Sequence, residues 1–564
     1  MASLVFNYLN YSSQYFLLFF YFFFFGRAIL IVVTKLSKNK TQIPLFLLNT
    51  RTYILYPIIG IVAVSNILII LNFFLPLKSE FVYAVLFLIL FINFLEFKKM
   101  KFSLDPFKFF YFFIIPSILI FSSFDISYHY DAGYYHLNTQ NWLRESNIIY
   151  GFVNIFWPFG MASVYEYLSA ILWIGKNFLL LHFIDVIFIH FFFVFIFDSF
   201  FNPKYKEYKF MSVFILFFGI LDNFGFGGGR NGFLYFQGVG KQDIPLAILF
   251  FFISFTIFIF FRYKDISLIE IGIITVMSLF IFQLKVSSAI IFYLIALMFF
   301  LILSKKIFTF KELIKSQFLF ILLSFIWFLK TYLTSGCIIF PLSISCLNNF
   351  SWYIQGSTEA FEYISKHASL YFDLRKYTFG EWFQEFLSYD INKNVLFNFL
   401  MSISALALLK FFIFTKNYKQ ESFLKFVLFS FIFINFCYLI FFGPIPRYSI
   451  GIMLLVASSF SFFIGSFKLR FGNSIFIVLS IFCVLAFVRF SSYQAFLNGD
   501  EHNLFDPSKY DVINKEIGFT NFNTDWVFPT EGDQCWTNIN CSMAKADIVL
   551  SEEFFKTAYK NPNN

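Results

Sequence analysis

One polar stretch of the chain, residues 127 to 160, carries residue types that could perform acid–base chemistry: SYHYDAGYYHLNTQNWLRESNIIYGFVNIFWPFG. Asp131 lies near its start, and its carboxylate could take a proton from an acceptor hydroxyl within hydrogen-bond reach. The same carboxylate could instead cap a helix that starts near Gly133. His136 follows five residues later and could bind phosphate or a metal, or make a structural hydrogen bond. The stretch therefore predicts a candidate site centred on Asp131.

A second set of candidates lies where apolar runs begin or end. Its members are Arg230 in GFGGGRNG, Lys241 and Asp243 in KQDIPLA, Lys285 in QLKVSS, Lys330 in WFLKTYLTSG and Arg447 in PIPRYSIG. Ionisable residues at membrane depth are costly and mark functional sites. Cations from several helices could bind one phosphate or pyrophosphate, with arginine as a bidentate partner. The alternatives are that each cation reaches toward lipid headgroups, and that Asp243 caps its helix, pairs with a cation or contacts a sugar hydroxyl.

Composition identifies the elements that must position these residues. Of the 564 residues, 59% are hydrophobic and only 13% are charged, whereas soluble domains carry about 25% charged residues. We therefore expect an all-α polytopic membrane protein. The net charge of +9 comes from short basic clusters between apolar runs, a pattern that sets orientation in the bilayer and does not support nucleic-acid binding.

Apolar runs of about 17 to 25 residues predict about fourteen spanning helices. We expect them near residues 14–34, 53–77, 81–97, 108–124, 178–199, 209–223, 243–262, 266–284, 286–303, 316–334, 393–414, 423–442, 447–466 and 473–490. The basic clusters then lie inside, and the polar segments lie outside. The run 161–175 is short and contains Glu166, so we expect an interfacial or partly inserted helix there.

This topology divides the chain into six parts. They are N-terminal transmembrane helices (1–124), a large first outer loop with the interfacial helix (125–177), central transmembrane helices (178–334), a second outer loop (335–392), C-terminal transmembrane helices (393–490) and an extracytoplasmic tail (491–564).

Cysteine spacing fits the same topology. Cys337 and Cys346 lie in the second outer loop, and Cys535 and Cys541 lie in the tail. Two closely spaced pairs on an oxidising face predict two small disulfide loops. Metal binding would need further His or Cys nearby, and neither segment provides them.

Several segments resemble a known family. An acidic residue after a helix in the first large outer loop, followed by Tyr and His, resembles the C-type glycosyltransferase (GT-C) superfold of polytopic enzymes that use polyprenyl-phosphate sugars. Four segments are also similar to bacterial membrane proteins of surface-polysaccharide biosynthesis: YDAGYYHLNTQNWLRESNIIYGFVNI (130–155), LKTYLTSGCIIFPLSISC (329–346), PRYSIG (446–451) and GDQCWTNINC (532–541).

The resemblance implies roles for three of the candidate residues. Asp131 would be the catalytic carboxylate, Asp243 would match the acidic residue at a later helix entrance, and Arg447 would contact the donor phosphate. The acidic pair of the superfold is Asp131–Ala132 here, so a divalent metal stays an open possibility that the sequence does not require.

The expected function follows from this resemblance. It is glycosyl transfer from a polyprenyl-phosphate donor to a glycan or lipid acceptor on the extracytoplasmic face of a bacterial inner membrane. Two alternatives remain: an O-antigen-type polymerase or ligase that relies on outer Arg and His, and a transporter or flippase for lipid-linked glycans. Asp185 and Asp222, within apolar runs, leave the transporter open.

Overall fold

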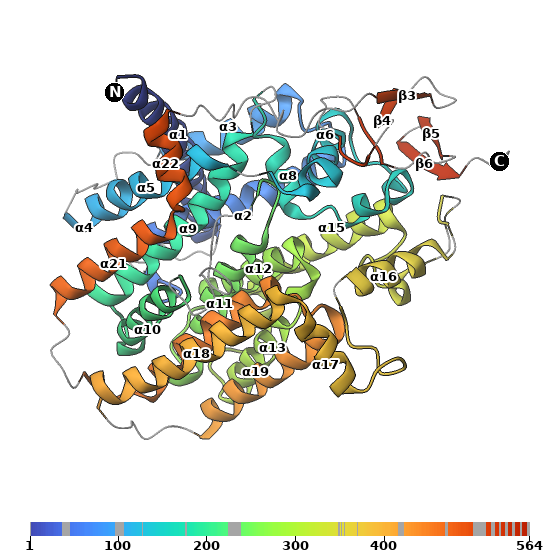
Figure 1. The fold of residues 1–564 in the computed structure, drawn as a ribbon. Helices are drawn as coiled ribbons and strands as arrows, with labels where there is room; N and C mark the ends of the chain where they lie inside the picture. Colours follow the sequence, from blue (N-terminus) through green and yellow to red (C-terminus); the bar gives the residue numbers. More distant parts are fainter. Residues whose placement is uncertain are drawn as a thin grey trace.

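The structure is a computed structural model that is almost entirely helical (Figure 1). It describes residues 2–36, 46–95, 106–126, 128–174, 178–223, 238–347, 350, 352–354, 356–368, 370–415, 422–467 and 472–499, and in the tail residues 515–519, 525–529, 532–535, 540–543, 548–552 and 555–560.

The first half of the chain forms helices that alternate with short connections. They are α1 (Ala2–Leu36), α2 (Thr52–Asn72), α3 (Glu80–Leu95), α4 (Pro106–Phe109), α5 (Ile115–Leu119), α6 (Leu137–Glu145), α7 (Phe152–Ile155), α8 (Val164–Ala170), α9 (Leu179–Phe201), α10 (Lys206–Asn223) and α11 (Asp243–Tyr263). A two-stranded hairpin, β1 (Phe46–Leu47) and β2 (Thr50–Arg51), precedes α2.

The second half continues this pattern and ends in two small hairpins. Its helices are α12 (Leu268–Leu284), α13 (Ile291–Ser304), α14 (Phe310–Ser316), α15 (Phe318–Ser335), α16 (Ser357–Ala368), α17 (Phe379–Ser388), α18 (Asp390–Ile413), α19 (Ser422–Phe442), α20 (Ile450–Ser459), α21 (Asn473–Phe487) and α22 (Phe490–Asn498). Strands β3 (Lys515–Phe519) and β4 (Asp525–Pro529) pair antiparallel, as do β5 (Ile548–Glu552) and β6 (Lys556–Lys560).

The helix lengths and compositions are those of a multi-pass membrane protein. Within the described ranges, ten helices are long and apolar enough to cross a bilayer. The count becomes eleven if α21 and α22, which meet at an angle of 70°, form one broken span. The stretch expected to be interfacial contains only the seven-residue helix α8, which is too short to cross.

Two helices form the centre of the bundle. Helices α9 and α11 are predominantly apolar and are buried along almost their entire length, as expected for spans surrounded by other helices. Around them, α1 and α2 cross closely at Gly26 and Gly60. A Cβ atom on Gly60 would lie 2.0 Å from the backbone oxygen of Phe22, so the crossing requires glycine.

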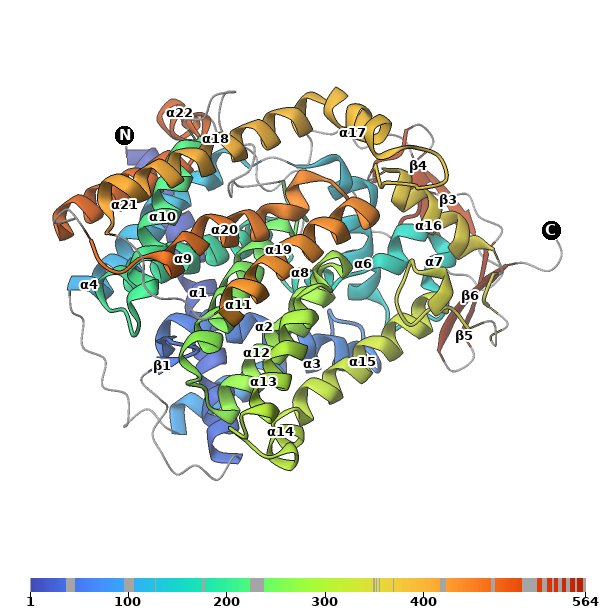
Figure 2. The same ribbon diagram turned by 90° about the horizontal axis from the view of Figure 1, so that it is seen from below.

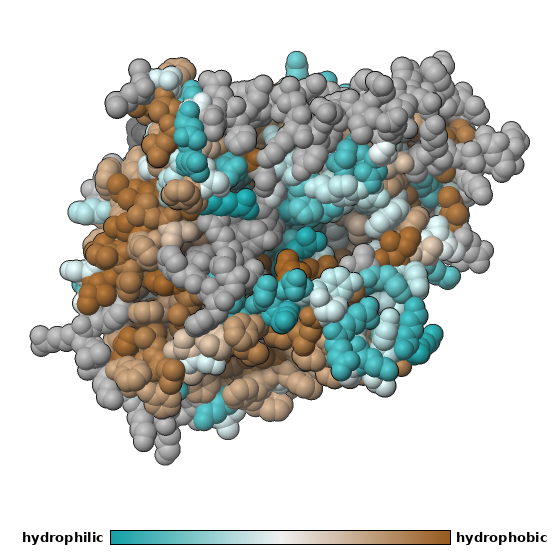
Figure 3. Space-filling model, viewed as in Figure 1, coloured by the Kyte–Doolittle hydropathy of each residue, from teal (hydrophilic) through white to brown (hydrophobic). Residues whose placement is uncertain are grey.

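Three segments that are distant in sequence gather at one end of the molecule. Helix α7 packs against β6, and Figure 2 shows the two side by side. Helix α16 and the tail strands lie toward the same side of the molecule in both ribbon views (Figures 1 and 2). Hydrophobic and hydrophilic residues cover different parts of the surface. Hydrophobic residues cover the left and lower parts of the view, and hydrophilic residues gather around α16 and α17 (Figure 3).

Both predicted disulfides are confirmed. Cys337 bonds to Cys346, and Cys535 bonds to Cys541. In the described part of the chain, Cys437 and Cys483 are free thiols on helices α19 and α21.

Candidate functional site

A cavity of about 460 Å³ is lined by residues of α8, α12, α15 and α16 and by the first residue of α11. Five cations of the described residues line it, and they come from different parts of the chain. One of them is Lys366 on α16. Lys241 precedes α11, Lys285 lies between α12 and α13, Lys330 is on α15, and Arg447 precedes α20. The cavity walls are mainly apolar and aromatic: Tyr135, Phe282, Trp327, Ile338, Ile339, Phe340, Leu342, Tyr438 and Phe442. The cavity can therefore hold a ligand with both an anionic and an apolar part.

Asp243 lies among three of these cations, Lys241, Lys285 and Arg447, which together form the cation cluster. It is the first residue of α11 and is almost completely buried. One of its carboxylate oxygens lies 2.8 Å from Nζ of Lys285, and the other lies 3.5 Å from Nε of Arg447. Lys285 Nζ also lies over the ring of Tyr448, 3.6 Å from its centroid. One carboxylate thus balances two cations, which leaves this part of the cavity with an excess of positive charge.

Asp131 lies at the edge of this cluster and forms an ion pair with Lys241. It occupies the position before a short π-helix (Ala132–His136), but its side chain makes no capping hydrogen bond. Its backbone N–H donates to Nδ1 of His129, at 3.2 Å. The structure therefore favours an electrostatic role for the carboxylate over the capping alternative.

The surroundings of Asp131 favour the ionised form of its carboxylate. Burial disfavours the charge of Asp131, but the Lys241 ammonium outweighs it and holds the pKa of Asp131 below its ordinary value. Burial and the nearby Arg447 lower the pKa of Lys241, although Asp131 acts in the opposite direction. Asp131 is therefore a carboxylate at neutral pH, and Lys241 gives up its proton more readily than a solvated lysine.

A buried histidine and glutamate form a second polar unit in the cavity wall. Nδ1 of His136 hydrogen bonds to Glu166 of α8. The other Glu166 oxygen accepts from Nε2 of Gln140, at 2.7 Å, and Oε1 of Gln140 accepts from the Trp173 indole N–H, also at 2.7 Å. This chain of bonds fixes the orientation of the imidazole.

Lys330 is the most buried of the cavity cations. Its side chain is 2% exposed, and its Nζ donates to the backbone oxygen of Ala162 at 2.6 Å. The ammonium also lies 4.6 Å from the Trp327 ring centroid. In the described part of the chain, no carboxylate oxygen lies within ion-pair distance of Lys330, so none of these carboxylates would compete with an anionic ligand for it.

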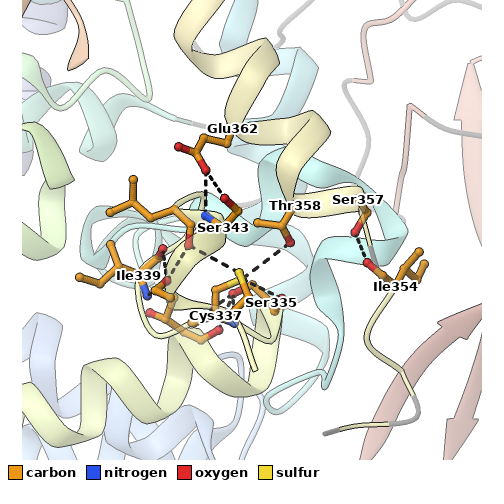
Figure 4. Close-up of a disulfide and its surroundings, with 12 residues drawn as sticks. Ser335, Cys337, Ile339, Ser343, Ile354, Ser357, Thr358 and Glu362 are labelled. Atoms are coloured by element: carbon orange, nitrogen blue, oxygen red, sulfur yellow. Dashed lines mark hydrogen bonds between the residues drawn. A yellow bond between two sulfur atoms is a disulfide. The ribbon is translucent and has the colours of Figure 1, made fainter. Parts of the chain in front are cut away.

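The first disulfide anchors α16 beside the cavity (Figure 4). Glu362 of α16 accepts hydrogen bonds from the backbone N–H and the hydroxyl of Ser343, at 2.9 and 2.6 Å. Ser343 lies inside the loop closed by Cys337 and Cys346. Because Glu362 and Lys366 both line the cavity, the disulfide loop fixes this part of its wall.

The tail packs on the polar segment that carries Asp131. The backbone N–H of Cys535 donates to the Gly133 carbonyl at 2.9 Å, and the Trp142 indole N–H donates to the Cys541 carbonyl at 3.1 Å. The hydroxyl of Ser542 donates to the Ile155 carbonyl at 2.8 Å. The second disulfide loop thus holds the helix turn that follows Asp131.

The donor set does not fit a divalent metal. Asp131 is followed by Ala132 and not by a second acidic residue, and its carboxylate already forms an ion pair with the Lys241 ammonium. In the portion of the chain that the structure describes, no group of three or more His, Cys, Asp or Glu side chains is placed to hold a metal ion. We therefore derive no step that uses a metal.

The structure brings most of the sequence-predicted residues together. His136, Asp243, Lys285, Lys330 and Arg447 line one cavity. Asp131 adjoins that cavity through Lys241, and Arg230 lies outside the described residues.

The sequence prediction did not include two pairings and two wall residues of this site. These are Lys241 as the partner of Asp131, Glu166 as the partner of His136, and Glu362 and Lys366 in the cavity wall. Glu166 had a detectable signal, because an acidic residue in a short apolar run must find a buried partner.

Comparison with known proteins gives a family without an assigned activity. No curated protein and no solved structure matches the chain. One family, described as "Domain of unknown function (DUF8201)", matches residues 13–454, which include the polar segment with Asp131, the cation cluster and the first disulfide. Because this match covers well over half of the chain, the protein belongs to the DUF8201 family.

Proposed function

We propose that this protein is a membrane glycosyltransferase of the GT-C type. It transfers a sugar from a polyprenyl-phosphate donor to a glycan or lipid acceptor in the synthesis of cell-surface polysaccharide. The site lies on the extracytoplasmic face of a bacterial inner membrane. In this arrangement the chain crosses the bilayer about fourteen times, with α3, α10 and α12 among the crossings.

The observation that carries the proposal is the pairing of cations and apolar walls in one cavity. Lys285, Lys330 and Arg447 would bind the donor phosphate, and the aromatic and aliphatic wall would hold the first isoprene units. Arginine suits a phosphate because its planar guanidinium can donate two parallel hydrogen bonds. Positioning and electrostatic stabilisation of the departing phosphate would supply most of the rate.

Asp131 is the catalytic carboxylate in this proposal. It lies at the edge of the cation cluster, where an acceptor could approach from the polar side. The acceptor hydroxyl donates a hydrogen bond to Asp131 and loses its proton to it as the new glycosidic bond forms. Lys241 keeps the carboxylate ionised until the acceptor binds.

The polar residues of the central helix α9 do not favour the transporter alternative. Each of three has a side-chain partner inside the bundle. Ser122 pairs with His182 at 3.0 Å, the Tyr165 hydroxyl donates to Asp185 at 3.0 Å, and Tyr15 pairs with His190 at 2.8 Å. Such paired residues stabilise helix packing. A transport path needs polar groups that face an open route.

The test is the composition of surface polysaccharide in cells that carry Asp131→Asn. We expect loss of one glycan while the protein remains present and inserted. Glu145→Gln is the matched control, because Glu145 lies in the same polar segment and pairs with Lys78 at the surface. An unchanged glycan in Asp131→Asn cells would contradict the catalytic role. If Arg447→Ala alone removed the glycan, the polymerase or ligase alternative would be preferred.

A further inference from the structure

Among the described residues that line the cavity, His136 is the one histidine, and one of its ring nitrogens is already hydrogen bonded. Its side chain is 3% exposed, and Nδ1 is bonded to Glu166. Within the described part of the chain, Nε2 makes no hydrogen bond to another protein group, yet the residue lines the cavity. This is the arrangement of an imidazole that presents Nε2 to a ligand while a carboxylate holds Nδ1.

The ring is also fixed from its flank. Gly240 has φ +92°, and a Cβ atom there would lie 2.9 Å from both Cγ and Cδ2 of His136. The imidazole also contacts Tyr135, and the centroids of the two rings lie 4.2 Å apart. A glycine is therefore required at this point, and it leaves the imidazole little freedom to rotate away from the cavity.

The charged groups around His136 come from four elements. Glu166 is on α8, Asp131 precedes the π-helix that ends at His136, Lys241 precedes α11, and Lys330 of α15 lies near Glu166. His129 is the other nearby imidazole. Of these groups, Glu166 is in direct contact with the imidazole.

We propose that His136, positioned by Glu166, donates the Nε2 proton to the phosphate that leaves the sugar. This inference rests on the proposed function and assigns separate groups to its two proton transfers. Asp131 serves the acceptor at the edge of the cavity, and His136 serves the donor phosphate inside it. Glu166 is a positioning residue that acts through the imidazole.

The step balances without an outside reactant. The acceptor oxygen bonds to C1 of the sugar while the bond from C1 to the phosphate oxygen breaks, and its electron pair stays on the phosphate. The acceptor proton passes to Asp131, and the Nε2 proton of His136 passes to the phosphate. As products leave, the proton on Asp131 returns through water to His136. The second pKa of a phosphomonoester, about 6, is close to the ordinary pKa of imidazole, about 6.5, so the proton can be shared.

The experiment measures how binding of a prenyl phosphate depends on pH. The full chain in lipid nanodiscs is titrated calorimetrically with geranyl phosphate from pH 6 to 8.5. Above the pKa of both groups, binding requires uptake of one shared proton, so wild-type affinity should fall about tenfold per pH unit. His136→Asn should bind as weakly as the wild type at pH 8.5, and its affinity should fall clearly less than tenfold per pH unit.

Three further variants make the result specific. His367→Asn, on exposed α16, should follow the wild type. Lys330→Met should weaken binding, because the cavity loses one cation. Glu166→Gln should reduce the pH dependence of binding, because the imidazole loses the carboxylate that holds Nδ1. Thermal unfolding of His136→Asn and of His136→Gln checks that each variant folds.

The outcomes separate the two proposals. A wild-type slope that persists in both His136 variants would overturn the role of His136 and leave the proposed function standing. Binding by the His136 variants that is far weaker than wild type at pH 8.5 would indicate a structural role and overturn the inference. If the wild type binds no geranyl phosphate at any pH, the phosphate-donor function itself fails.

Discussion

Replacement of Asp243 by Asn should both destabilise the protein and strengthen anion binding. The carboxylate is buried and lies between two cations, 2.8 Å from Lys285 Nζ and 3.5 Å from Arg447 Nε. Asparagine has almost the same volume, so the substitution removes the negative charge and leaves packing nearly unchanged. Lys285 and Arg447 then repel each other with no carboxylate between them.

The expected loss of stability depends on how far the side chains of Lys285 and Arg447 are exposed to water. Removal of one member of a buried ion pair costs about 3–5 kcal/mol. Because the side chains of Lys285 and Arg447 are 23% and 32% exposed, water recovers part of this loss, and we expect about 3 kcal/mol. An anion that enters the cavity restores the missing charge. At 100 times its Kd, inorganic phosphate would contribute about 2.7 kcal/mol, which is most of the loss.

The assay is reversible unfolding in mixed micelles with and without phosphate, combined with calorimetric measurement of phosphate affinity. We expect phosphate to bind Asp243→Asn about tenfold more tightly than wild type, because no carboxylate competes for the cations. Asp265→Asn is the control. Asp265 pairs with Lys204 at 2.8 Å on the surface, where such pairs contribute about 0–1 kcal/mol. A loss of stability no larger than the control's, or no gain in phosphate affinity, would refute the cation-cluster reasoning.

Two other predictions concern the helix crossing and the pH response. Gly60→Ala should destabilise the protein by about 1–3 kcal/mol or more, since its Cβ would meet the backbone oxygen of Phe22 at 2.0 Å. Gly380→Ala, in a helix with open space around it, should be neutral or slightly stabilising in the same unfolding assay. The pKa of Asp131 lies below its ordinary value, so its pair with Lys241 stabilises the fold above about pH 4 and is lost progressively at lower pH. Asp131→Asn should therefore show less acid destabilisation than wild type, and equal acid sensitivity would contradict that reasoning.

The sequence predicted the helices and the cavity cations for the same physical reason. A charge in an apolar run is costly unless it meets a partner or a polar cavity. Lys285, Lys330, Asp243 and Arg447 stand out in the sequence because their neighbours are apolar, and the structure places all four around one cavity. The cysteine pairs were predictable because each pair closes a loop of fewer than about ten residues.

The partners of these residues could not be predicted, because each comes from a distant part of the chain. Lys241 is separated from Asp131 by 110 residues, and Glu166 is separated from His136 by 30. Within a membrane protein, helix order in sequence does not determine which helices pack together. The contacts of the tail are more distant still, since Cys541 accepts a hydrogen bond from Trp142 across 399 residues.

A single rigid element links the two halves of the candidate site. Helix α11 is buried along its whole span and therefore has little freedom to move. Its first residue, Asp243, organises Lys285 and Arg447, and Lys241, two residues earlier, holds Asp131. The carboxylate that would serve the acceptor and the cations that would serve the donor are thus fixed to the same helix terminus. In the proposed function, this shared anchor would give the donor and the acceptor a fixed relative position, which a direct transfer between them requires.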